Sequence, residues 1–221
     1  SSIFKIVDST TCDFTWDAFK AEFNGGEHSD IVTRNKFYIE AANSSPLHKI
    51  CTENEISFKY LDEDLYELTK EETSIAGQTG TVTYQMDGSG TLTDTVFDGP
   101  VTTVEFPEYI GPNTIKKIGS GAFQDKCTLT EVTISDTIEE IGASAFQGCH
   151  NLKYVTFEND TVQIGTNAFL TQKVTSHSKY CRSYEGLDTD GQTIQLYDST
   201  GMTDSSNDPT VKLHFVGKKH K

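Results

Sequence analysis

Two adjacent stretches, IKKIGSGAFQDKCTLTEVTI at residues 115–134 and IEEIGASAFQGCHNLKYVTF at residues 138–157, decide how this chain folds. Aligned 23 residues apart, they carry matching apolar or small residues at Ile115/Ile138, Ile118/Ile141, Gly119/Gly142, Ala122/Ala145, Phe123/Phe146, Leu129/Leu152, Val132/Val155 and Ile134/Phe157. A third copy begins at Val162 and fades after Phe169. Self-similarity at a fixed spacing is the sequence signature of repeat architectures, so we weigh it before local propensity.

The repeat spacing predicts a solenoid with one turn of chain per repeat. A single unit cannot bury its own apolar residues, but stacked units place each of them above its equivalent and build a continuous core. The segment from Leu129 to Ile134 alternates like a strand. The recurring glycine at Gly119 and Gly142 marks a turn that a Cβ atom would crowd.

A degenerate copy precedes the clear repeats. Val101-Thr-Thr-Val-Glu-Phe106-Pro107 resembles Leu129-Thr-Glu-Val-Thr-Ile134-Ser135. Five extra residues follow it, and we expect residues 109–113 to form a bulged loop. The sequence therefore predicts a solenoid over residues 101–169.

These repeats resemble the BspA-like leucine-rich repeat family (LRR), whose units read approximately I-x-x-I-G-x-x-A-F-x-x-C-x-x-L-x-x-V-x-I-P. Cys149 stands at the family's cysteine position, whereas Lys126 replaces it one repeat earlier and Cys127 follows one place late. The resemblance implies a surface-exposed protein of a host-associated microbe that mediates adhesion or protein interaction. It does not identify a ligand.

The repeats are flanked by segments of a different character. Residues 1–100 are predicted to be an α+β N-terminal region or cap, with an amphipathic helix at Trp16–Phe23 and strands at residues 36–41, 56–61 and 81–86, separated by turn formers at residues 43–46 and 87–90. Residues 170–221 are predicted to be a C-terminal β cap and tail, with a closing hairpin of residues 193–197 and 211–216. The expected fold class is β-rich α+β, built on a short leucine-rich-repeat β-solenoid.

The charge and composition of the chain limit the classes of partner that we expect it to bind. The chain carries a net charge of −15, of which −11 falls within residues 1–100 (7 Lys/Arg against 18 Asp/Glu). A negative field repels nucleic acids and anionic membrane surfaces, so neither is an expected partner. No apolar run approaches the roughly 20 residues of a membrane-spanning helix, so we expect a soluble mature chain without membrane insertion. The chain starts at Ser1 without a recognisable leader, which suggests processing or trimming.

The five cysteines match no zinc or redox spacing. Their odd number leaves at least one of them free, and both extracellular disulfides and buried free thiols agree with the sequence.

None of the six histidines forms a helical His-x-x-x-His pair. The pair Gly119-Ser-Gly121 lacks the remainder of a phosphate loop. The acidic runs at residues 62–64 and 188–190 do not continue into a calcium loop and are predicted to be solvated. We therefore expect no cofactor, no metal site and no catalytic residues.

Strand alternation gives a candidate ligand-binding face. If Leu129, Val132 and Ile134 point inward, the residues between them point outward, and stacked coils align their equivalents. The predicted face consists of Thr103, Glu105, Glu131, Thr133, Tyr154 and Thr156. An exposed Tyr provides a rigid amphipathic contact at an interface. An ordinary polar sheet surface is the alternative.

The leading functional hypothesis is a non-catalytic recognition protein, extracellular or at a cell surface, that binds a protein or glycan ligand, including one of a host. A structural spacer or assembly component is the second hypothesis, and its exposed residues would be dispensable. A hydrolase with its site in residues 1–100 is the third, and it would need a pocket with convergent carboxylates or a Cys/His pair.

Overall fold

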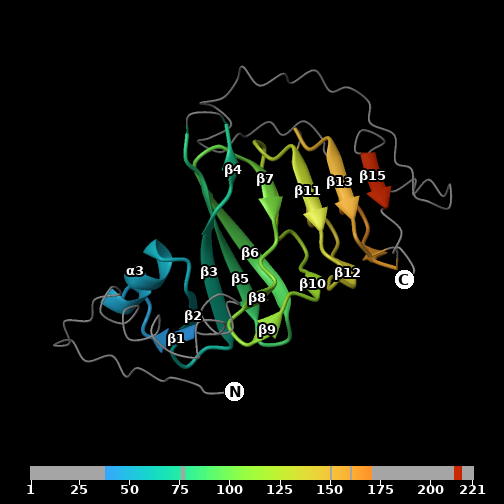
Figure 1. Cartoon of the computed structure of the whole chain (residues 1–221). Coiled ribbons are helices and arrows are strands. Elements are labelled where there is room, and N and C mark those ends of the chain that lie inside the picture. The colour runs from blue at the N-terminus through green and yellow to red at the C-terminus, as the bar shows by residue number, and fades with distance from the viewer. Residues whose placement is uncertain (1–37, 76–77, 150, 160, 171–211, 216–221) are drawn as a thin grey trace, which may run out of the picture.

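The computed structural model describes residues 38–75, 78–149, 151–159, 161–170 and 212–215. Apart from the helix α3 and a small hairpin, the regular elements of the described residues are strands of two main sheets (Figure 1). The first sheet has the order β1-β2-β3-β5-β6-β10-β12-β14, and the second has the order β15-β13-β11-β7-β4. The predicted helix at Trp16–Phe23 and the predicted strand at residues 193–197 lie outside the described residues.

The N-terminal part of the first sheet contains a helix between two parallel strands. Its elements are β1 (Tyr38–Ala41), α3 (Pro46–Glu53), β2 (Ser57–Tyr60), β3 (Leu65–Glu71), β5 (Thr81–Asp87) and β6 (Thr91–Asp98). α3 begins at Pro46 because Pro suits the first helical position and the Ser45 hydroxyl accepts a hydrogen bond from the His48 N–H at 3.2 Å. The three predicted strands are confirmed, and the remaining strands of this part pair antiparallel.

Strand β6 belongs to both the N-terminal part and the solenoid. One edge of β6 pairs antiparallel with β5, while Thr91 and Leu92 on the other edge pair parallel with β10 (Lys117–Ile118). The parallel run continues through β12 (Glu140–Ile141) and β14 (Gln163–Ile164). The sheet is therefore continuous from the N-terminal part into the repeats (Figure 1). The predicted division after residue 100 falls between β6 and β7.

The second sheet confirms the predicted solenoid. It contains β7 (Val101–Glu105), β11 (Glu131–Ile134), β13 (Tyr154–Phe157) and β15 (Lys212–Phe215) as parallel neighbours, with β4 (Thr73–Ser74) antiparallel to β7 at one edge. In Figure 1 the four parallel strands stand side by side. The degenerate copy is confirmed as well, since Val104 pairs with Val132 in the predicted register.

The last strand has a position that the sequence did not predict. Residues 212–215 form a strand, and β15 pairs parallel with β13, so that it extends the second sheet by one position. The physical reason lies in its sequence: Leu213 and Phe215 have the alternation of Val155 and Phe157 and take the next positions in register. KLHF at 212–215 is thus a further copy of the strand segment YVTF at 154–157.

The core consists of ladders of equivalent residues. The rings of Phe123 and Phe146 stack with centroids 4.8 Å apart, and those of Phe146 and Phe169 with centroids 5.1 Å apart. All three rings are fully buried. Stacked aromatic rings add to the large apolar area that each buries, so this column stabilises adjacent coils against one another.

Glycine is required where successive coils approach most closely. The N–H groups of Gly119, Gly142 and Gly165 each donate to a carbonyl of the preceding coil at 2.7 Å. A Cβ atom at Gly142 would lie 2.6 Å from the backbone N of Ser120 and 2.8 Å from the carbonyl carbon of Gly119. At Gly119 a Cβ atom would lie 2.6 Å from the Leu92 carbonyl oxygen, so the stacking of coils accounts for this glycine as well.

The predicted bulged loop is a small hairpin, formed by β8 (Tyr109–Ile110) and β9 (Asn113–Thr114). Its turn contains Gly111 with φ of 60°, and a Cβ atom there would lie 2.7 Å from the Tyr66 ring of β3. The extra residues therefore pack against the N-terminal part of the sheet.

The described cysteines include both buried free thiols and a disulfide-bonded cysteine, the two states that agree with the sequence. Cys51 and Cys149 are free and buried, whereas Cys127 is disulfide-bonded. The Cys149 thiol donates to the Phe123 carbonyl at 3.0 Å. Lys126 occupies the equivalent position one repeat earlier, and its Nζ lies 5.5 Å from the centroid of the Phe97 ring. Burial lowers the pKa of Lys126.

Gly142→Ala is expected to destabilise the solenoid by about 1–3 kcal/mol, because the added methyl group would push apart two backbones that are in contact. Chemical denaturation monitored by circular dichroism measures the change. Ala143→Ser, at the exposed neighbouring position, is the control and should leave the free energy of unfolding nearly unchanged. Equal stability of Gly142→Ala and the wild-type protein would contradict the close approach of the coils.

Ser144→Gly is expected to stabilise the protein. Gly121, Ser144 and Asn167 occupy equivalent positions, and all three have positive φ (69°, 57° and 58°). A left-handed conformation costs an L-residue about 1–2 kcal/mol, and glycine avoids that cost while losing more backbone entropy on folding. We expect a net gain of about 1 kcal/mol in the free energy of unfolding, measured by the same denaturation. A glycine at exposed Ala143, which has no positive φ, should lower it instead.

Candidate functional site

The six predicted face residues are brought together in two rows across β7, β11 and β13. In the first row Thr103, Glu131 and Tyr154 are register partners. In the second row the partners are Glu105, Thr133 and Thr156. Thr73 of β4 extends the first row at one edge, and the backbone of β15 continues the rows to Lys212 and His214 at the other. We call the six predicted residues the outer face of the second sheet.

Burial confirms which side chains of these strands face the core and which face outward. Val132 and Ile134 are 2% and 0% exposed, whereas Glu131, which precedes Val132, is exposed. Tyr154 is 49% exposed, an uncommon value for a large aromatic side chain on a sheet with a packed inner side. The Thr and Glu positions around it are exposed or half-buried. The outer face therefore presents one aromatic ring among hydroxyl and carboxylate groups.

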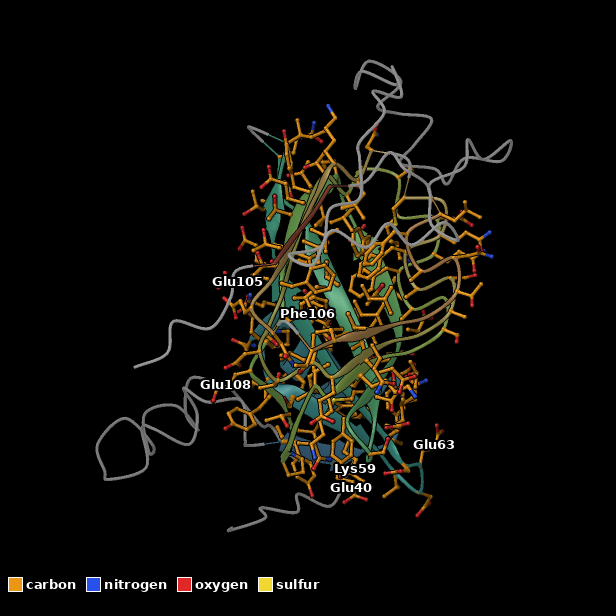
Figure 2. All side chains as sticks on the ribbon, turned by 90° about the vertical axis from the view of Figure 1, so that its right-hand side faces the viewer. Glu40, Lys59, Glu63, Glu105, Phe106 and Glu108 are labelled. Atoms are coloured by element: carbon orange, nitrogen blue, oxygen red, sulfur yellow. The ribbon has the colours of Figure 1, made fainter. Side chains whose placement is uncertain are left out.

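The margin of the outer face is acidic. Glu105 and Glu108 lie at one side of the molecule in Figure 2, while Phe106 between them lies further inward. Among the ion pairs of the described residues, none includes the carboxylate of Glu105 or Glu131. The Lys70 ammonium, which lies nearby, donates to the Glu105 carbonyl at 3.0 Å and pairs with Glu72 at 3.5 Å.

A buried carboxylate holds the first strand of the outer face in place. Glu72, which directly follows β3, accepts hydrogen bonds from the Tyr84 hydroxyl at 2.5 Å and from the Glu105 N–H at 3.2 Å. Lys70 pairs with the same carboxylate. Burial raises the pKa of Glu72, although these donors oppose that shift. Glu72 thus connects the first sheet, through Tyr84, to the backbone of β7.

A second polar cluster lies beneath α3 and was not predicted from the sequence. The Glu67 carboxylate accepts from the Tyr60 hydroxyl at 2.5 Å and from Gln85 Nε2 at 3.3 Å, and His48 Nε2 lies 2.8 Å from its other oxygen. The Ser44 N–H donates to His48 Nδ1 at 3.3 Å, so Nε2 carries the proton that is donated to Glu67. The cap sequence Ser45-Pro46, which starts α3, was a signal that could have placed His48 on its first turn.

This cluster lacks the properties of a nucleophilic site. Cys51 lies one turn after His48 on α3, but burial raises the pKa of its thiol to about 12, with a further contribution from Glu67. Reactive cysteines have a lowered pKa because the thiolate is the nucleophile. Within the described residues, no group of three or more His, Cys, Asp or Glu side chains could hold a metal ion. Residues 62–64 form an exposed turn between β2 and β3, and residues 188–190 lie outside the described chain.

Comparison with known proteins found a matching family model and a similar solved structure. Residues 93–185 match the BspA type leucine-rich repeat region, in six copies. The match begins within β6, where the structure places the first coil. The comparison with curated proteins found no match. The crystal structure of a leucine-rich cell surface protein from Faecalibacterium prausnitzii A2-165 is 28% identical, with a TM-score of 0.30. That likeness covers 46% of this chain and 28% of the other, so the chain spans less than a third of that protein's length.

Glu72→Gln is expected to change how stability depends on pH. Because the pKa of Glu72 is raised in the folded protein, its contribution to stability is full below the ordinary value of 4.5 and is lost as pH rises through the folded value. Gln cannot ionise, so the free energy of unfolding of the variant, relative to wild type, should increase as pH rises above 4.5. Denaturant titrations at several pH values measure this difference. Glu71→Gln, at the exposed neighbouring position, should not reproduce the trend, and a flat difference for Glu72→Gln would contradict it.

Proposed function

We propose that the protein recognises a ligand through its outer face, and the match of residues 93–185 to the BspA type leucine-rich repeat region supports this proposal. The ligand is a protein or a glycan, including one of a host, and the protein acts without catalysing a reaction. The observation that carries the proposal is the alignment of six predicted face residues in two rows, with the Tyr154 side chain 49% exposed among them.

The chemistry of the outer face supports recognition. Tyr is enriched among the residues that dominate binding energy, because its ring offers a large contact area and its hydroxyl a hydrogen bond. Tyr154 is held on a sheet whose inner side is a packed ladder, so little conformational entropy is lost when the face is covered. Exposed Glu131 and half-buried Thr133 and Thr156 provide polar groups around the ring.

We also propose an extracellular or cell-surface location. The matched repeat family supports it, because BspA-like repeats imply a surface-exposed protein. The disulfide at Cys127 agrees with an oxidising environment outside the cytosol. Among the described residues, no helix has the length and apolar character required to cross a membrane.

A structural spacer is the second candidate function. The continuous first sheet favours it, because pairing of β6 with both β5 and β10 joins the N-terminal part and the repeats without a linker. A spacer has no need of specific outer-face residues. The two functions therefore differ in their response to substitutions on the outer face.

The double variant Glu131→Ala, Tyr154→Ala is expected to weaken binding to a selective ligand by at least about tenfold, which corresponds to about 1.4 kcal/mol. The ligand is first identified by binding of the purified chain to an array of host matrix proteins and glycans. Affinities of wild type and variant are then measured by surface plasmon resonance, after circular dichroism has verified the fold.

The matched control is the double variant Glu140→Ala, Gln163→Ala. These two residues are register partners on β12 and β14, so they repeat the arrangement of Glu131 and Tyr154 on the other sheet. The control should bind like the wild type. Loss of binding in both variants, or in neither, would count against the outer face, and the absence of any selective ligand would favour the spacer.

A further inference from the structure

We propose that the outer face binds a basic protein segment and that Glu131 and Tyr154 together receive the guanidinium group of an arginine in that segment. This inference rests on the proposed function, because it names the chemistry of the partner at the same face. It is carried by the register of the two side chains, by their exposure, and by the charge around them.

The two side chains stand next to one another on adjacent strands. Glu131 and Tyr154 are direct register partners in a parallel pair, so their backbones are separated by about 4.8 Å. The next residues, Val132 and Val155, are buried and also paired, which turns both preceding side chains to the outside. A planar group lying on the Tyr154 ring would therefore have the Glu131 carboxylate at its edge.

That combination suits a guanidinium group better than an ammonium group. A guanidinium is planar, is attracted to the face of an aromatic ring, and offers paired N–H donors that match a carboxylate. An ammonium is a compact, strongly hydrated charge without that planar surface. The pair of Glu131 and Tyr154 thus predicts a preference for arginine over lysine.

The charge of the outer face points to a cationic partner. Glu105 lies one strand away from Glu131 in the second row, and neither carboxylate has an ion-pair partner among the described residues. Exposed Lys153 precedes Tyr154 in the chain and forms no ion pair with Glu131. With a net charge of −15 over the whole chain, the protein attracts basic partners and repels acidic ones.

A neutral glycan is the alternative ligand, and it would bind through stacking and hydrogen bonds without needing a charged group. A sugar ring would stack on Tyr154 and use the hydroxyl and carboxylate groups as hydrogen-bond partners, so Gln in place of Glu131 would serve it nearly as well. Among the described residues neither carboxylate has an ion-pair partner, and this favours the basic segment, because the attraction of a carboxylate is gained only with a charged ligand.

The test uses the full chain and three synthetic peptides of equal length, in which serine alternates with arginine, lysine or glutamate. Fluorescence anisotropy at low and high salt gives each affinity. The arginine peptide should bind several-fold more tightly than the lysine peptide, and the glutamate peptide should not bind. Glu131→Gln and Tyr154→Leu should each weaken the arginine peptide about three- to tenfold, whereas Tyr154→Phe, which keeps the ring, should retain most of the affinity.

Glu139→Gln is the matched control, since Glu139 is an exposed carboxylate outside the outer face, in the repeat that contains Tyr154. It should leave the affinity unchanged, which separates local recognition from the effect of net charge. Equal affinity for the arginine and lysine peptides, or equal loss in Glu131→Gln and Glu139→Gln, would overturn the inference. So would the absence of peptide binding.

The outcome is distinguishable from failure of the proposed function. A ligand from the array that is lost in Glu131→Ala, Tyr154→Ala but retained in Glu131→Gln would keep the outer face as a recognition site and reject the arginine site in favour of a neutral ligand. Loss of that ligand in Glu131→Gln, together with selective binding of the arginine peptide, would support both proposals.

Discussion

The close approach of successive coils is the constraint on which the rest of this structure depends. Gly119, Gly142 and Gly165 each donate to the preceding coil at 2.7 Å, at a separation that leaves no room for a Cβ atom. Further turns of each coil are joined in the same way, for example by the Phe123 N–H and the Ala145 carbonyl at 2.8 Å. These backbone bonds set the coil spacing, and the spacing in turn determines whether stacked side chains such as Phe123 and Phe146 are in contact.

The same spacing produces the outer face. A side chain that points outward in one coil lies one strand separation from its equivalent in the next, so any residue type placed there becomes part of a row. Selection can change Glu131, Tyr154 or Thr156 without touching the inner ladder, because successive residues of a strand point to opposite sides. A solenoid therefore combines a fixed core with a surface that can vary independently, and the proposed recognition function makes use of this separation.

The sequence predicted the regular coils because both of their signals are local. The 23-residue period and the alternation within each strand were sufficient to place Thr103, Glu131 and Tyr154 in one row.

The first coil, which begins in β6, was not predicted from the sequence, and there is a physical reason for this. Thr93 follows Leu92 where Gly119 follows Ile118, and glycine is dispensable there because β6 meets the antiparallel β5 and not another coil. Long-range pairings were equally hidden, including the position of β15 beside β13 and the contacts of Glu67, since neither repeats at a fixed distance along the chain.

The N-terminal part covers the end of the solenoid at its first coil. An uncovered solenoid end exposes strand edges and apolar ladders, both of which invite association with other chains. Here β5 covers the edge of β6, and β4 covers the edge of β7, so both sheets are closed by the same segment of chain. Between them the Glu72 carboxylate receives donors from both sides, from Tyr84 of the first sheet and from the backbone of Glu105 in the second. A cap made of hydrophobic contacts alone would cover the ladder but leave the register of β7 free to vary, whereas directional hydrogen bonds to Glu72 fix it. Because Glu105 belongs to the outer face, the segment that closes the solenoid also determines where the first carboxylate of that face is held.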